Sequence, residues 1–142
     1  MSNNLLISVR PKFASRILSG KKTVELRRLR PKVSSGDNLI FYISSPDKNI
    51  KAISKIEKIV GAHLDVLWDE VKERASVTHE EFMEYFKGKD HGYAIYFSQT
   101  EQLKNPIKLE SIKEIIPGFR APQSFRYFSQ TEMSNVLSMA TA

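Results

Sequence analysis

Residues 20–32 read GKKTVELRRLRPK, and together with the residues just before them they decide how the chain begins to fold. Within this stretch, Thr23–Arg28 alternates apolar and polar residues, which is typical of a strand with one buried face. The apolar run Leu5–Val9 predicts an earlier strand. Between the two, Pro11–Ser19 carries apolar residues at helical spacing, with a proline at the first helical position and a glycine directly after the last. We therefore expect strand, helix and strand in that order.

The rest of the chain predicts short elements of both kinds, without the regular alternation of strands and helices that builds a parallel sheet. Further strands are expected at Asn38–Ile43, at Lys51–Val60, where broken alternation indicates a bulge, at Gly92–Phe97, and in part of Pro106–Ile115. Helices are expected to begin at Asp65 and Thr78 in the acidic middle of the chain, and at Ser129 near its end. About five or six short strands with about three flanking helices favour an α+β fold, best described as a small, partly open β-barrel of mixed or antiparallel strands.

The composition limits the class of protein. The chain has 142 residues, which favours one domain, and a net charge of +6. It has no cysteine, which excludes disulfides, thiolate metal sites and a cysteine nucleophile. Its apolar runs are too short to span a membrane, and the N-terminus lacks the apolar core of a secretion signal. We therefore expect a monomer in a reducing cytoplasm, with no membrane partner.

The charge is unevenly distributed along the chain. Residues 1–60 hold 13 Lys and Arg against 4 Asp and Glu, a net charge of +9. Residues 61–101 hold 4 against 9, and residues 102–142 hold 5 against 3. This distribution predicts one strongly positive face, which attracts phosphate backbones or other anionic partners.

The chain does not contain the common metal-binding and catalytic motifs. His63, His79 and His91 are 16 and 12 residues apart, so they lack the spacing of a metal site. There is no phosphate-binding glycine loop and no serine nucleophile motif. We therefore expect no metal and no cofactor.

Glu25 is the unusual residue of the basic stretch. It shares a strand face with Arg27 and not with Val24 or Leu26, and cations surround it in the sequence. A carboxylate in that setting is held in its charged form, and it can orient an arginine, accept a hydrogen bond from a base or activate a water. The alternative is that Glu25 and Arg27 form an ion pair that only decorates the sheet.

A second unusual segment, residues 116–128, reads IPGFRAPQSFRYF. Aromatic side chains stack on unpaired bases, and arginines add charge and cation–π contact. The alternative is that these aromatic residues close one end of the core. The two interpretations are evenly balanced for Phe119 and Tyr127, whereas Phe125 is expected in the core.

The beginning of the chain resembles a known family. Gly20, Lys22, Glu25 and Arg27 match the pattern G-x-K-x-x-E-x-R, and with the strand and helix before them they resemble the opening of an ASCH domain, of the PUA-like superfamily. The turns at Gly36-Asp37 and Ser44-Ser45-Pro46 also fit that family. The run Pro122–Tyr127 resembles the C-terminal end of a prokaryotic subgroup described as predicted transcriptional regulators.

This resemblance implies a single PUA-like domain over residues 1–128, followed by a tail, residues 129–142, that is a short helix or flexible. It also implies a cleft beside the first helix, lined by Lys22, Glu25 and Arg27, that takes RNA or a modified nucleotide. Some relatives are described as hydrolases acting on acetylated cytidine, and others as RNA-cleaving enzymes. The former carry Thr where this chain has Glu25. If this chain is a hydrolase, Lys22 and Glu25 are its acid–base pair.

The basic stretch, the aromatic segment and the resemblance together give one set of candidate contacts to nucleic acid or a nucleotide. They are Arg10, Lys12, Lys21, Lys22, Glu25, Arg27, Arg28, Arg30, Ser44, Ser45, Arg120, Gln123, Arg126 and Tyr127.

Three functions follow from these observations. The first is binding of RNA, another single-stranded nucleic acid or a modified nucleotide, in a regulatory role, with phosphates on Arg28, Arg30 and Lys32. The second is hydrolysis of RNA or of a modified nucleoside. The third is regulation through a protein partner that binds the acidic helices between Asp65 and Gly88.

Overall fold

The computed structural model describes residues 3–140, which form six strands and five helices. In chain order these are β1 (Asn4–Val9), α1 (Pro11–Leu18), β2 (Val24–Arg27), β3 (Asn38–Ile43), β4 (Asn49–His63), α2 (Leu64–Val71), α3 (His79–Tyr85), β5 (His91–Lys108), α4 (Leu109–Ile115), β6 (Phe125–Phe128) and α5 (Gln130–Ala140).

One mixed sheet holds these strands in the order β2-β5-β4-β3-β1-β6. β1 and β3 are parallel, and the other neighbouring pairs are antiparallel. The predicted α+β class is thus confirmed. A closed barrel is not confirmed, because β2 and β6 are the two edges of an open sheet within residues 3–140.

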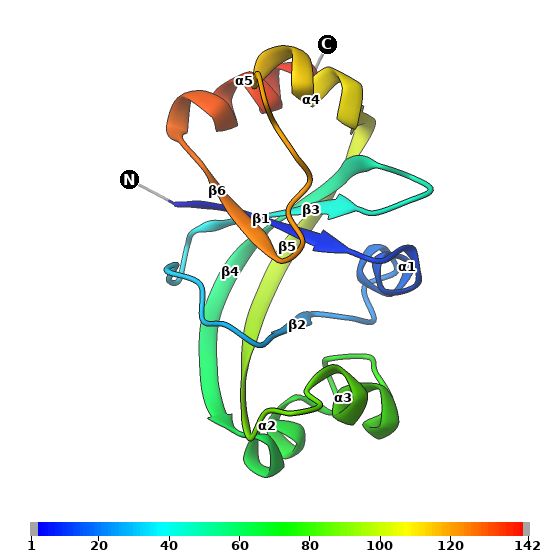
Figure 1. Ribbon diagram of the computed structural model, residues 1–142, viewed down its shortest axis with the longest axis vertical. Coiled ribbons are helices and arrows are strands. Elements are labelled where there is room, and N and C mark those ends of the chain that lie inside the picture. The colour runs from blue at the N-terminus through cyan, green and yellow to red at the C-terminus, as the bar shows by residue number, and fades with distance from the viewer. Residues whose placement is uncertain (1–2, 141–142) are drawn as a thin grey trace.

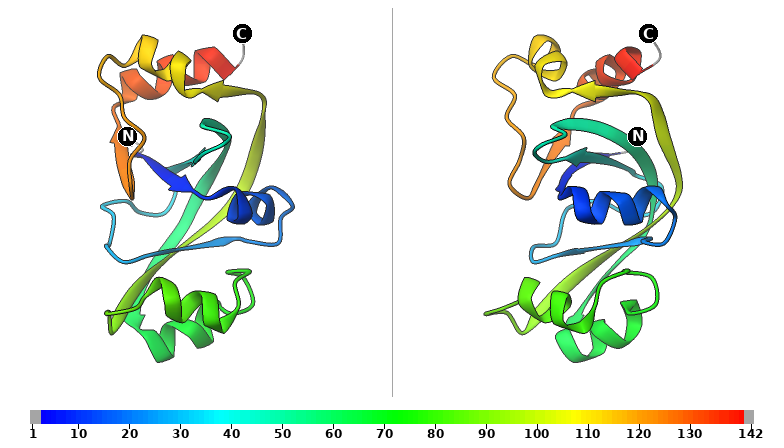
Figure 2. Two further views of the ribbon diagram at one scale, coloured as in Figure 1. Left: turned by 45° about the vertical axis from the view of Figure 1, so that its right-hand side comes forward. Right: turned by 90° about the vertical axis from the view of Figure 1, so that its right-hand side faces the viewer.

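The long antiparallel pair β4 and β5 runs the length of the molecule, with helices gathered at its two ends (Figure 1). α2 and α3 lie at one end, α4 and α5 lie at the other, and α1 lies beside the sheet between them (Figure 2). The pairing of β4 with β5 shifts register after Ile50, Ile53 and Ile56, so the bulge predicted for this strand is confirmed.

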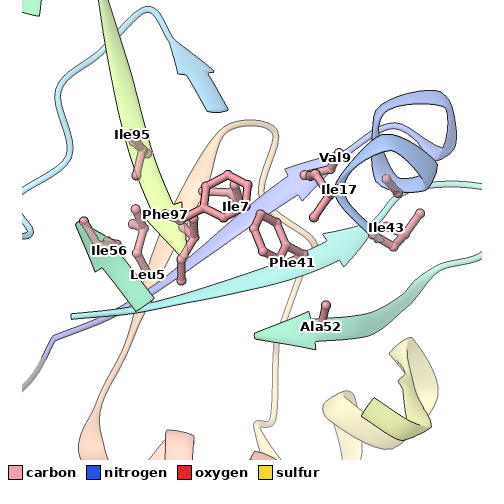
Figure 3. Close-up of a cluster of buried hydrophobic side chains, with 12 residues drawn as sticks. Leu5, Ile7, Val9, Ile17, Phe41, Ile43, Ala52, Ile56, Ile95 and Phe97 are labelled. Carbon is pink, nitrogen blue, oxygen red and sulfur yellow. The ribbon is translucent and has the colours of Figure 1, made fainter. Parts of the chain in front are cut away.

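Three apolar clusters form the core. The central cluster joins β1, β3, β4 and β5 to α1, with the rings of Phe41 and Phe97 edge to face at 5.1 Å between centroids (Figure 3). A second cluster lies under α4 and α5 and includes Phe119 and Phe128. The third packs α2 and α3 against β2 and β5. Phe119 is therefore a core residue, and Phe125 is only partly buried at the edge of the central cluster.

Most helix boundaries follow the sequence signals. α1 begins at Pro11 and is followed by Gly20, whose φ of +84° suits the glycine after a helix. Thr78 and Glu81 form the predicted capping box of α3. The N-cap predicted at Asp65 is wrong, because His63 occupies that position and its ring nitrogen accepts a hydrogen bond from the amide of Asp65.

The largest error of the sequence analysis lies between residues 98 and 115. β5 continues to Lys108, well beyond the predicted strand, and a helix, α4, follows at Leu109–Ile115. Ile107 and Leu109 alternate like a strand, which hides a helical spacing of apolar residues that starts at Leu109 and includes Ile112. Helices were predicted at the places of α1, α2, α3 and α5, and α4 is the helix of residues 3–140 that was not predicted.

α5 follows β6 and covers one end of the core. Ser129 and Glu132 exchange side-chain and backbone hydrogen bonds at its start, so the capping box predicted there is confirmed. Met133 and Val136 are buried in the second cluster. The last two residues of the predicted tail, 141 and 142, lie outside the described residues. None of the helices within residues 3–140 is both long and apolar enough to cross a membrane.

Candidate functional site

β2 presents its two faces to different surroundings. Val24 and Leu26 pack into the cluster under α2 and α3. Glu25 and Arg27 project from the opposite face, where they meet Lys22 from the turn before the strand. The exposed fraction is 2% for Lys22, 7% for Glu25 and 6% for Arg27, so all three charges are buried.

Glu25 is the centre of this buried group, which we call the Glu25 network (Lys22, Glu25 and Arg27). Its Oε2 accepts a hydrogen bond from Nη2 of Arg27 at 2.7 Å, and its Oε1 lies 3.5 Å from Nζ of Lys22. Burial lowers the pKa of Lys22, and the nearby Glu25 carboxylate acts in the opposite direction. Buried charges persist only with partners this close, because removing them from water is costly.

Lys22 also helps to fasten the link between α2 and α3. The carbonyl oxygens of residues 74–76 in that link each accept a hydrogen bond from a residue of α1 or of the segment between α1 and β2. The Thr23 amide donates to the first at 2.9 Å and the Lys22 ammonium to the second at 2.8 Å. The guanidinium of Arg16 donates to the third at 2.7 Å. The link is therefore held down by donors from α1 and from the turn before β2.

Arg27 makes a similar connection on the other side of the network. Its guanidinium donates to the carbonyl oxygen of Ser8 at 3.0 Å and to that of Ser124 at 3.2 Å. Ser8 belongs to β1 and Ser124 directly precedes β6, so Arg27 links the edge strand β2 to the opposite edge of the sheet. Its Nε is buried without a hydrogen-bond partner in the described residues.

A more exposed ion group joins α1 to α3. The Glu81 carboxylate lies 2.6 Å from Nζ of Lys12 and 3.2 Å from Nη1 of Arg16. It also accepts a hydrogen bond from the Thr78 amide. The hydrogen bond from Lys12 is the largest of the effects that lower the pKa of Glu81 to about 2. Lys12, a candidate contact from the sequence, therefore already has a carboxylate partner.

The Glu25 network thus differs from the open cleft lining that the sequence suggested. The motif residues do lie together, but their charged groups are engaged with one another and with backbone carbonyls. Each of the three residues is at most 7% exposed, so they present little surface to a ligand in this conformation.

Exposed cations flank β2, one before the strand and three after it. Lys21, Arg28, Arg30 and Lys32 are exposed, and we call them the basic strip. None of them has a carboxylate within ion-pair distance in the part of the chain that the structure describes. Arg28 lies over the ring of Tyr85, 4.9 Å from its centroid. Arg30 and Lys32 line a hollow of about 410 Å³.

Three further candidates lie near the start of α1. Arg10 is exposed and is the residue before that helix. The amide of Ser44 donates to the carbonyl of Val9, which places the Ser44–Ser45 turn beside Arg10 at the end of β1. Ser45 is exposed and Ser44 is half-buried.

The C-terminal candidates have different surroundings. Arg120 and Gln123 are exposed on the loop before β6. Arg126 is sandwiched against the rings of Phe119 and Phe128 and forms an ion pair with a glutamate of α5. Tyr127 is 41% exposed, and its hydroxyl accepts a hydrogen bond from the amide of Lys32. Arg126 is thus occupied within the protein, whereas Tyr127 keeps a free ring surface.

Known proteins similar to this chain agree with this architecture. The family described as a domain of unknown function (DUF365) matches residues 5–117. A protein of Zymomonas mobilis named ASCH domain-containing ribonuclease is 30% identical over 136 residues, which cover 96% of this chain and 91% of that protein. The chain belongs to the ASCH family. The crystal structure of ASCH from Zymomonas mobilis has a TM-score of 0.91 and 30% identity, over 96% of this chain and 94% of that one.

The ASCH fold extends to more distant proteins. Human THYN1, solved in complex with DNA containing 5-methylcytosine, has a TM-score of 0.64 over 99% of both chains. Its identity to this chain is 16%, so the likeness is one of fold. The family resemblance inferred from the G-x-K-x-x-E-x-R pattern is confirmed by the Zymomonas mobilis relative.

The groups that hold the network of this ASCH protein in place were not predicted from the sequence. Arg16 lies one helical turn after Lys12, so a charged face of α1 could have revealed it. The carbonyl acceptors of Ser8, Ser124 and residues 74–76 give no signal in the sequence, because every residue has such a group.

Proposed function

We propose that this ASCH protein binds RNA through the positive surface formed by the basic strip and the start of α1. The observation that carries the proposal is that Lys21, Arg28, Arg30 and Lys32 are exposed without carboxylate partners in residues 3–140. Exposed, uncompensated cations attract phosphates, and release of counterions then drives binding. These four cations lie within residues 1–60, whose net charge of +9 predicted a positive face.

In this proposal the Glu25 network has a positioning role. Lys22 holds the α2–α3 link, Arg27 holds the loop that carries Arg120 and Gln123, and Glu25 keeps both cations in place. The network thus fixes two segments on either side of the basic strip.

Binding is tested by fluorescence anisotropy with labelled 12-nucleotide single-stranded RNA and matched DNA over a salt series. The expected result is salt-dependent binding that Arg28→Ala weakens and Lys87→Ala, an exposed lysine next to α3, leaves unchanged. Each phosphate contact removed lowers the salt slope by about one unit. Binding that does not respond to salt, or that is absent for both polymers, contradicts the proposal and directs attention to free modified nucleosides.

A second candidate function is RNA cleavage. The observation that favours it is the ribonuclease name of the Zymomonas relative, which matches nearly the whole chain. Cleavage needs one group to take a proton from the attacking oxygen and another to give one to the leaving oxygen. Lys22 and Glu25 are the pair that the sequence suggests, and the lowered pKa of Lys22 suits a group that exchanges its proton. Their burial requires the 74–76 link to open before substrate reaches them.

Cleavage is tested on a denaturing gel with end-labelled RNA, at several pH values, for the wild type, Lys22→Met and Glu25→Gln. If the pair is catalytic, both variants bind RNA and leave it intact, while circular dichroism shows a folded chain. Cleavage that survives in both variants places the acid–base groups elsewhere. Intact RNA with the wild type leaves binding as the function.

A further inference from the structure

We infer that the hollow lined by Arg30, Lys32 and Asn3 is the place where one unpaired nucleotide of a single-stranded RNA sits, with Tyr127 beside it. This inference rests on the proposed RNA binding and specifies the form of RNA and the contact point. The hollow has a volume of about 410 Å³ and is also lined by Pro31, Val33 and Ser34. The hollow is shallow and open to solvent, so it can hold part of a nucleotide while the rest of the strand stays on the surface.

The walls of this hollow are fixed by a buried carboxylate. Oδ1 of Asp37 accepts a hydrogen bond from the amide of Asn3 at 2.9 Å, and Oδ2 accepts one from the amide of Ser34 at 2.8 Å. The exposed fraction of Asp37 is 5%. Its negative charge is therefore directed at backbone donors, which leaves the two cations of the hollow to face a phosphate.

Tyr127 contacts Lys32, a residue of the hollow. Its hydroxyl accepts a hydrogen bond from the amide of Lys32 at 2.7 Å, and its ring stands edge-on to Phe125 with centroids 5.8 Å apart. The ring is held at both ends and is still 41% exposed. A rigid, exposed aromatic ring is a stacking surface that costs little side-chain entropy on binding.

The mixture of groups points to a single strand. Leu29 is 62% exposed between Arg28 and Arg30, so apolar surface alternates with cations along the chain. Unpaired nucleotides offer both phosphates and free base faces, whereas a duplex hides its base faces in the stack. We therefore assign the phosphate to Arg30 and Lys32 and the base to the ring of Tyr127.

The test compares two labelled probes of equal length, a 12-nucleotide oligouridylate and a 12-nucleotide RNA hairpin, by anisotropy over a salt series. Arg30→Ala and Lys32→Ala are each expected to lower the salt slope by about one unit. Tyr127→Leu is expected to weaken oligouridylate binding about tenfold, and Tyr127→Phe to keep most of it. Lys104→Ala, an exposed lysine of β5, serves as the matched control.

The outcomes separate this inference from the proposed function. Absence of RNA binding by the folded wild type overturns the proposed function. Wild-type binding that none of the three hollow variants changes overturns the hollow alone. Equal affinity for the hairpin overturns the single-strand assignment, and a Tyr127→Phe variant that binds as weakly as Tyr127→Leu overturns the stacking role.

Discussion

Lys21 and Lys22 are neighbours with the same side chain, yet one is exposed and the other is 2% exposed. The difference separates the two parts of the G-x-K-x-x-E-x-R region. The Glu25 network turns its charges inward and binds carbonyl groups of distant segments, whereas the basic strip turns its charges to solvent without acidic partners. Residue type alone therefore does not show what a cation in this stretch does. Its burial and its partners show whether it holds the fold together or is available to a ligand.

The sharpest test of this difference is Glu25→Gln. The amide keeps the size of the side chain but removes the negative charge that Lys22 and Arg27 share. Breaking a buried ion pair leaves uncompensated charge, so the free energy of unfolding is expected to fall by about 3 kcal/mol. Urea denaturation measures it.

The matched control is Glu57→Gln, because Glu57 forms an ion pair with Arg74 in which both side chains are well exposed. Exposed pairs contribute about 0–1 kcal/mol. If Glu25→Gln and Glu57→Gln lower the free energy of unfolding by the same small amount, the Glu25 network is effectively solvated. It then does not differ from the basic strip in its contribution to stability.

Lys22→Met is the next largest change. Methionine keeps the apolar stem, but the carbonyl of Ala75 and the Glu25 carboxylate each lose a donor. Because these buried acceptors are then unsatisfied, we expect the free energy of unfolding to fall by about 2 kcal/mol at neutral pH.

The effect of Lys22→Met also depends on pH. The folded pKa of Lys22 lies below its ordinary value of 10.5, so between the two values the unfolded chain binds more protons. The wild type therefore gains stability as the pH rises through that window, and Lys22→Met does not. The difference in free energy of unfolding between the wild type and Lys22→Met therefore widens toward pH 10.5. Lys21→Met is expected to show the same pH dependence as the wild type. A constant difference contradicts the burial of the charge.

The sequence predicted the regular parts of this fold because local patterns decide them. β3 has the predicted bounds, α1 starts at the proline, and α3 starts at its capping box. The same local patterns failed at α4, where alternation at Ile107 and Leu109 resembled a strand. The barrel that these patterns predicted is not confirmed, because β2 and β6 are the two edges of the sheet within residues 3–140.

The candidate site could be predicted only in part, because its internal acceptors are backbone atoms. The motif correctly grouped Lys22, Glu25 and Arg27, and charge alone suggested a positive face. What the motif could not show is that the 74–76 link and Ser124 lie opposite these cations, since long-range packing places them there. The direction in which each cation points is thus a property of the tertiary fold.

Glu81→Gln is an intermediate case between the two regions. Its carboxylate pairs with Lys12 and Arg16, and its side chain is 20% exposed. Glutamine retains the capping box, so the variant isolates the loss of charge. With solvent screening considered, we expect a loss of about 1 kcal/mol at neutral pH.

The pH dependence of Glu81→Gln follows from the lowered pKa. Glu81 has a folded pKa of about 2 against an ordinary value of 4.5. The stability that the Glu81 charge contributes is complete above pH 4.5 and is lost as the pH falls toward 2. The free energies of unfolding of the wild type and Glu81→Gln therefore converge near pH 2. Thermal unfolding between pH 2 and pH 7 measures this, and a difference that persists at pH 2 would assign the effect to packing instead of charge.

The smallest effect on stability is expected in the basic strip. Lys21→Ala and Arg30→Ala remove exposed side chains without carboxylate partners, so each should change the free energy of unfolding by less than about 0.5 kcal/mol. The same substitutions remove cations from the surface proposed to bind RNA, so they lower the salt slope of binding while stability stays constant. Glu25→Gln has the opposite profile, a large change in stability with the basic strip unaltered. If Arg30→Ala destabilises the fold as much as Glu25→Gln does, the basic strip is part of the structural network. Its exposed charges are then no evidence for phosphate binding.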